Sequence, residues 1–92
     1  MIEERVVVIN RLGLHARAAA LLVRTASSFQ SVLRLERIDG TASADAKSIL
    51  SVLMLAAARG TQLRATATGV DEKDAIGALS RLFADGFGES EQ

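Results

Sequence analysis

A histidine and an arginine stand two positions apart in this chain, where a loop leads into an expected helix. The segment reads GLHAR, from Gly13 to Arg17, and His15 is the chain's only histidine. A neutral imidazole is nucleophilic near pH 7 and can carry a phosphoryl group as a labile phosphoramidate. The guanidinium of Arg17 offers a planar set of donors that fits phosphate oxygens. The pair therefore points to phosphoryl transfer through His15.

The expected helix start strengthens this interpretation. Apolar residues recur at helical spacing from Ala16 onward, so the amides of Ala16 and Arg17 are the unpaired first donors at the positive end of the helix dipole. We expect these groups to bind phosphate, with Arg24 adding a weaker contribution two turns along the same face. The alternative is that His15 is a helix cap or a surface residue without chemistry, because each signal is weak by itself.

The composition narrows the function classes. The chain has 92 residues, of which 49% are apolar, and this suits one compact domain over residues 1–92. Its 11 basic and 11 acidic side chains cancel, so we expect neither nucleic-acid binding nor membrane insertion. With no cysteine and one histidine, we expect no metal site and no cofactor. The N-terminal segment MIEERVVVIN has the pattern of neither a secretory signal nor a membrane span, which favours a cytoplasmic protein.

Hydrophobic periodicity and turn signals predict the elements that position these groups. Their order, β-α-β-β-α-β-α, favours an α+β open-faced β-sandwich, with a four-stranded antiparallel sheet and three helices on one face. We expect acidic residues at the start of the third helix to satisfy its free amides. The predicted elements are a strand ending near Asn10, a helix from Ala16, strands at residues 32–38 and 41–44 joined by an Asp39-Gly40 turn, a helix over residues 46–58, a strand around residues 61–68, and a helix from Asp71 that Gly86 and the acidic tail GESEQ end.

The second predicted helix is more apolar than a helix on a sheet requires. Nearly every position from Ile49 to Ala58 is apolar, whereas such a helix buries a single stripe. Some of these side chains should reach solvent and form a partner surface. A core helix covered on both sides and a self-association face remain open as alternatives.

These segments together resemble the HPr phosphocarrier family of the bacterial phosphoenolpyruvate-dependent phosphotransferase system. The resemblance is carried by GLHAR, by AKSILSVLML at residues 46–55 and by ATG before an acidic helix start, and it spans nearly the whole chain. It implies that the Nδ1 atom of His15 accepts a phosphoryl group from enzyme I and passes it to an enzyme II A domain. Ala16 and Arg17 would then hold the phosphate. Such a protein is a relay intermediate rather than a stand-alone enzyme.

The resemblance also implies a regulatory site and a docking surface. Ser48 matches a serine that HPr kinase/phosphorylase modifies in many relatives, although a serine near a helix start is usually a cap. A phosphoryl group there would place about −1.5 to −2 charge beside an apolar surface and penalise docking. The partner-binding residues that the resemblance implies are Leu14, Leu21, Lys47, Ile49, Leu50 and Leu53.

Two departures from the family pattern stand out. Ala18 occupies the position of the usual proline, whose fixed φ suits a first helical turn. The interval between His15 and Ser48 is also slightly longer than in common members, which affects the alignment of the third strand. Two other functions stay open: a regulatory binding module of the nitrogen-related branch, and a small phosphatase-like enzyme with Arg17 on phosphate, for which no water-activating group is evident.

Overall fold

In the computed structural model, which describes residues 1–89, four strands form one antiparallel sheet. The strands are β1 (Ile2–Val7), β2 (Val32–Arg37), β3 (Ser43–Asp45) and β4 (Gln62–Thr68), and they lie in the order β1-β4-β2-β3. The helices are α1 (Ala16–Ser27), α2 (Ile49–Leu53) and α3 (Glu72–Ala84), followed by a 3-10 turn, η1 (Gly86–Gly88).

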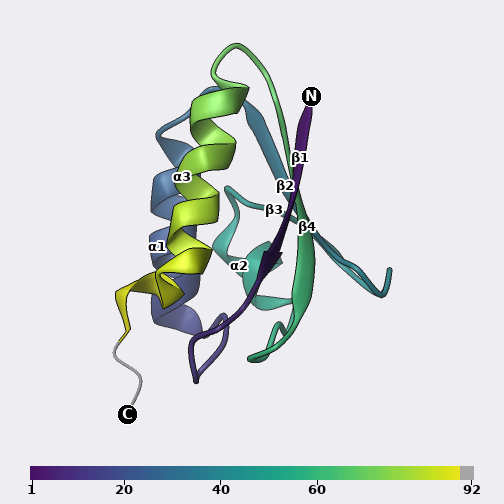
Figure 1. Ribbon diagram of the computed structural model, residues 1–92, viewed down its shortest axis with the longest axis vertical. Coiled ribbons are helices and arrows are strands. Elements are labelled where there is room, and N and C mark those ends of the chain that lie inside the picture. Colours follow the sequence, from purple (N-terminus) through teal and green to yellow (C-terminus); the bar gives the residue numbers. More distant parts are fainter. Residues whose placement is uncertain (90–92) are drawn as a thin grey trace.

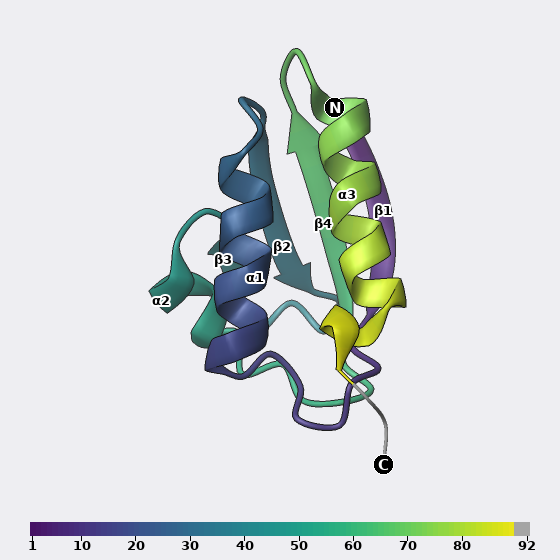
Figure 2. The same ribbon diagram turned by 90° about the vertical axis from the view of Figure 1, so that its left-hand side faces the viewer.

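The helices α1 and α3 lie side by side across one face of the sheet (Figures 1 and 2), and the other face is open. The short helix α2 packs against α1 and β3 at one edge. The expected element order and the open-faced α+β sandwich are confirmed. No helix among residues 1–89 is both long enough and apolar enough to cross a membrane.

The central strand β4 shows why the sheet has one dry face. Leu63, Ala65 and Ala67 are buried toward the helices, as their alternation with polar residues predicts. Arg64 faces the open side, where its guanidinium donates to Glu3 on β1 at 3.1 Å and to Glu36 on β2 at 3.0 Å. The helices supply the rest of the core through Ala18, Ala19, Leu22 and Ala26 of α1, and Ala75, Ile76, Leu79 and Phe83 of α3.

The start of α3 departs from expectation. Asp71 occupies the N-cap position but makes no capping hydrogen bond with its own helix. Its carboxylate instead accepts from the amides of Gln30 and Ser31, at 2.9 and 3.0 Å, and from the Ser31 hydroxyl at 2.5 Å. The Ser31 hydroxyl, then the Gln30 amide, hold the pKa of Asp71 below its ordinary value. Asp71 therefore ties the loop after α1 to the start of α3.

The second helix is much shorter than predicted, Ile49–Leu53 instead of residues 46–58. Before it, the Asp45 carboxylate accepts the amide of Lys47 at 2.9 Å, which forms a turn instead of a helix. After it, the backbone at Ala56 turns left-handed, with φ 50°, and the Arg37 guanidinium binds the carbonyl of Leu55 at 3.0 Å. A local turn before α2 and a tertiary contact after it therefore override a strong helical pattern.

The other boundaries differ by a few residues. The Asp39-Gly40 turn joins β2 and β3 as predicted, but β3 begins at Ser43 and not at residue 41. The first strand ends at Val7, while Val8 continues its pairing by donating to the Thr61 carbonyl at 3.0 Å. Of the predicted acidic tail, residues 90–92 lie outside the described residues.

Candidate functional site

The loop between β1 and α1 holds His15 in place through hydrogen bonds and a buried side chain. The Asn10 side-chain amide donates to the Gly13 carbonyl at 2.8 Å, and the Leu14 amide donates to the Ala57 carbonyl at 2.9 Å. Gly13 has φ +67°, a left-handed conformation that favours glycine. Leu14 is only 6% exposed, so its side chain anchors the loop in the core. The residue that follows is thereby positioned at the first turn of α1.

His15 is the N-cap residue of α1, so the capping alternative describes its geometry correctly. Its backbone is extended, and its Nδ1 atom accepts from the amide of Arg17 at 3.3 Å. The helix begins at Ala16 although Ala18 replaces the usual proline, because alanine is itself a strong helix former. The imidazole still has 28% of its side-chain surface exposed. Capping and access for chemistry therefore coexist at this residue.

The other ring nitrogen of His15 meets a carboxylate. The Nε2 atom is hydrogen bonded to Glu89, whose second oxygen accepts from the Asn10 side chain at 3.0 Å. The His15 contact, then the Asn10 contact, hold the pKa of Glu89 below its ordinary value. An ionised carboxylate can only accept and the Arg17 amide can only donate. The proton therefore lies on Nε2, and the lone pair on Nδ1 accepts from the Arg17 amide.

A shallow hollow opens beside this imidazole. It has a volume of about 220 Å³ and is lined by Arg11, Leu12, His15, Arg17 and Glu89. Arg17 and His15 border this hollow beside the first turn of α1, where positive charge favours an oxyanion, and the Glu89 carboxylate forms part of its wall. Arg17 also borders a second hollow of about 250 Å³ together with Arg24, as the shared helix face predicts. The arrangement combines a nucleophile with positive charge.

Comparison with known proteins identifies the family of this chain. The family model for the PTS HPr component phosphorylation site matches residues 2–85. The chain belongs to the HPr family. It is 47% identical to the phosphocarrier protein HPr of Xylella fastidiosa strain 9a5c over 89 residues, which cover 97% of this chain and 98% of the relative. It is 38% identical to the phosphocarrier protein NPr of Escherichia coli K12, over 96% of this chain and 97% of that protein. The crystal structure of HPr-C-His from Thermoanaerobacter tengcongensis superposes with a TM-score of 0.92 at 40% identity, covering 99% of this chain and 100% of that one.

The docking residues expected for an HPr-family protein divide into exposed and buried groups. Leu14 cannot extend an exposed patch, since it lies in the core, and Leu21 is half-buried. The Lys47 ammonium donates to the Phe29 carbonyl at 2.8 Å and so braces the end of α1. Four apolar side chains on α2 and at its C-cap are exposed, and we call them the α2 patch: Ile49, Leu50, Leu53 and Met54.

Ser48 lies at the edge of the α2 patch. It is the N-cap of α2, and its hydroxyl accepts from the Ser51 amide at 3.3 Å. The structure thus gives Ser48 a capping role, and the half-buried residue also stands where a charge would adjoin exposed apolar side chains. Met54, which is 71% exposed, was not among the docking residues predicted from the sequence.

Glu89 is the site residue that sequence reasoning missed. The turn Gly86-Phe87-Gly88 returns the chain from α3 to His15, and all three of its residues have positive φ, of 59°, 57° and 71°. The buried Phe87 ring packs edge-on against Phe83 of α3, with 5.0 Å between ring centroids. The two glycines that flank Phe87 could have predicted a turn from the sequence. No neighbouring residue indicated that this turn brings Glu89 to His15.

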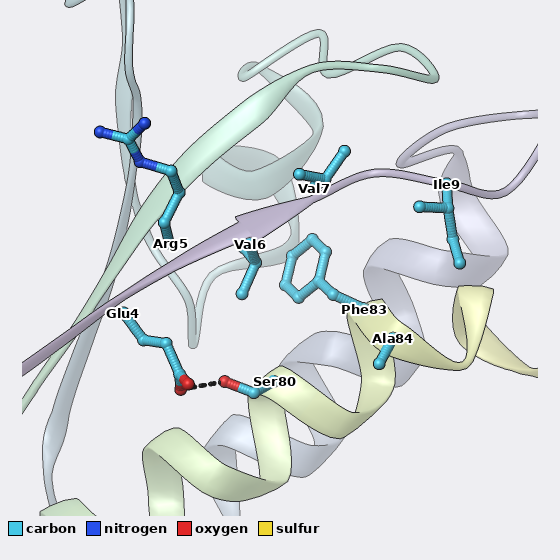
Figure 3. Close-up of a pocket in the computed structure, with 8 residues that line it drawn as sticks. All are labelled: Glu4, Arg5, Val6, Val7, Ile9, Ser80, Phe83 and Ala84. Atoms are coloured by element: carbon cyan, nitrogen blue, oxygen red, sulfur yellow. Dashed lines mark hydrogen bonds between the residues drawn. The ribbon is translucent and has the colours of Figure 1, made fainter.

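A hollow of about 240 Å³ between β1 and α3 is a weaker candidate (Figure 3). Its walls include Val6 and Phe83, and the Glu4 carboxylate already accepts a hydrogen bond from the Ser80 hydroxyl. Arg5 extends from β1 away from that pair. The Ser80 hydroxyl is engaged by Glu4, and Arg5 points away from it, so the His15 hollow is the candidate site.

Proposed function

We propose that this chain accepts a phosphoryl group on Nδ1 of His15 from the phosphohistidine of enzyme I and passes it to a histidine of an enzyme II A domain in the cytoplasm. The observation that carries this proposal is the unprotonated Nδ1 at the first turn of α1, which accepts from the Arg17 amide at 3.3 Å, a long contact that an incoming phosphoryl group can replace. Family membership supports the phosphocarrier role, and the geometry supports this atom as the acceptor.

The site can move a phosphoryl group without a cofactor. The Nδ1 lone pair attacks phosphorus, the bond from phosphorus to the donor nitrogen breaks, and its electron pair stays on the donor imidazole. The amides of Ala16 and Arg17 then hold phosphoryl oxygens that the Arg17 guanidinium also binds. Phosphoryl transfer depends chiefly on positioning and on neutralising charge, which these groups provide.

The α2 patch supports a docking function for both partners. Leu50 on α2 and Met54 at its C-cap are 66% and 71% exposed, and α2 packs against α1. Contiguous exposed apolar side chains mark interaction surfaces. Phosphorylation of Ser48 by an HPr kinase/phosphorylase would place a dianion beside this patch, where the helix dipole holds it and docking partners must desolvate it.

Labelled phosphoenolpyruvate and enzyme I test the proposal directly. We expect acid-labile label on the wild-type chain and none on His15→Ala, with Arg34→Ala as a labelled control that removes an exposed cation from β2, outside the site. Transfer of the label to an enzyme II A domain should follow. A wild-type chain that stays unlabelled, or a label retained by His15→Ala, would contradict the proposal.

The similarity to NPr favours a second candidate, a regulatory module of the nitrogen-related branch. The same His15 chemistry would then report metabolic state to a protein partner instead of supplying sugar uptake. Offering the labelled chain to enzyme II A domains of both branches distinguishes the candidates, because the faster acceptor identifies the branch.

A further inference from the structure

The carboxylate of Glu89 lies on the imidazole edge opposite the expected phosphoryl acceptor. It comes from the other end of the sequence, 74 positions from His15, and binds Nε2. The two ring nitrogens point to different sides of the imidazole, so Glu89 contacts the ring without covering Nδ1. Nδ1 therefore faces the start of α1, where its lone pair accepts from the Arg17 amide at 3.3 Å.

Glu89 is held in this position by contacts of its own. Its amide donates to the Gly86 carbonyl at 3.1 Å, in the turn that the buried Phe87 anchors. Its other carboxylate oxygen accepts from Asn10, which is 1% exposed and also donates to the loop carbonyl of Gly13 at 2.8 Å. Asn10 thus links Glu89 to the same loop that positions His15. The carboxylate is preorganised by packing and hydrogen bonds on both sides.

We propose that Glu89 is a positioning residue for phosphoryl transfer, which keeps the proton on Nε2 of His15 and the lone pair on Nδ1. This inference rests on the proposed function. It adds a residue that selects which nitrogen reacts, through the carboxylate-imidazole arrangement that fixes tautomer and ring orientation in other histidine sites.

The carboxylate also stabilises the product of the attack. When the neutral ring donates its Nδ1 electron pair to phosphorus, the ring becomes positively charged and keeps its proton on Nε2. The bond between phosphorus and the donor breaks at the same time, and the donor takes that electron pair. Glu89 then faces an imidazolium-like N–H, and a hydrogen bond between charged groups is stronger than one to a neutral ring. The return step, which discharges the ring, restores the neutral tautomer.

Glu89→Gln tests the proposal with little change in shape. A glutamine amide can donate to Nε2 as well as accept from it, so only the long 3.3 Å contact from the Arg17 amide to Nδ1 still favours the proton on Nε2 in this variant. Asp85→Asn is the matched control, because it removes an exposed carboxylate from the same segment without touching His15. Thermal unfolding of each variant verifies that the fold is kept.

Two measurements read out the role of Glu89. Nitrogen-15 NMR of the single histidine should show the proton on Nε2 in the wild type and in Asp85→Asn, and a mixture of tautomers in Glu89→Gln. Single-turnover transfer from phosphorylated enzyme I should slow by about 10- to 100-fold in Glu89→Gln, as when carboxylates that orient metal-binding histidines are removed. Asp85→Asn should transfer at the wild-type rate.

Direct phosphorylation with phosphoramidate separates this inference from the proposed function. The wild type should carry the group on Nδ1 alone, and Glu89→Ala should carry part of it on Nε2. If Glu89→Gln keeps the wild-type tautomer and rate, the proposal is overturned. If enzyme I fails to label the wild type while phosphoramidate still discriminates between the nitrogens, the proposed function fails and the effect of Glu89 on the ring stands.

Discussion

Replacing Gly13 by alanine tests how the loop before His15 is held. An added Cβ would lie 2.6 Å from the Ala57 carbonyl oxygen and 3.0 Å from the Ala58 Cα. Both are backbone atoms, and the Ala57 oxygen already accepts the Leu14 amide. Gly40→Ala is the matched control, since Gly40 has a similar φ of +78° but no atom within 4 Å of the added Cβ.

The magnitude follows from two separate costs. A left-handed alanine costs about 1–2 kcal/mol in either variant. Crowding a packed region costs about 1–3 kcal/mol more, and only Gly13→Ala incurs it. Alanine also lowers the entropy of the unfolded chain, an offset of about 0.4–1 kcal/mol that both variants share. The free energy of unfolding should therefore fall by about 1–3 kcal/mol more in Gly13→Ala than in Gly40→Ala.

Urea denaturation followed by circular dichroism measures this difference, and an unchanged m-value shows that the two-state comparison holds. Thermal unfolding gives a second reading, because 1 kcal/mol shifts the midpoint by about 4–8 °C in a domain of this size. Phosphorylation of His15 should slow in Gly13→Ala alone, because the displaced loop leads into the helix start. Equal losses of stability in both variants would refute the reasoning, because the close contact with Ala57 would then carry no cost.

The other predictions concern the docking surface, the α2 cap and pH. Leu50→Glu should weaken enzyme I binding, measured by calorimetry, while Val70→Glu, at a residue 85% exposed outside α2, should not; equal effects would contradict a specific α2 patch. Ser48→Ala should lower the free energy of unfolding by about 1 kcal/mol through loss of the cap, while Ser48→Asp should retain the cap but weaken docking. The pKa of Asp71 is lowered in the folded state, so its contribution to stability is present above its unfolded pKa and is lost as the pH falls through the folded pKa. Asp71→Asn should therefore destabilise the protein near neutral pH and flatten the acid limb of its stability curve, and an unchanged acid limb would count against this assignment.

Residues close together in the sequence were enough to predict much of the fold and the part of the site formed by His15 and Arg17. The alternation in β4, the Asp39-Gly40 turn and the start of α1 at Ala16 all depend on neighbours within a few positions. The spacing of His15 and Arg17 at a helix start belongs to the same class, because an N-cap and its first amides are set by adjacent residues. Such features could be predicted because sequence proximity and spatial proximity coincide.

Contacts between distant segments decided the rest. The helical pattern of residues 46–58 yields to Arg37, which takes up a carbonyl after α2, and to the packing of buried Leu55. Leu14 was expected to belong to the partner-binding surface near His15, but the turn at Gly13 directs its side chain into the core. Propensity acts within one segment, whereas burial depends on what the rest of the chain places opposite it.

The sequence by itself determined that a nucleophilic histidine stands at a helix start beside an arginine, and it determined the order of strands and helices. Only the tertiary structure supplied the second contact that holds the proton on Nε2 of His15. That contact comes from Glu89, 74 positions away, and depends on the buried Asn10 that holds it. No local pattern encodes such a contact, because it forms when the turn after α3 folds back against the loop before α1.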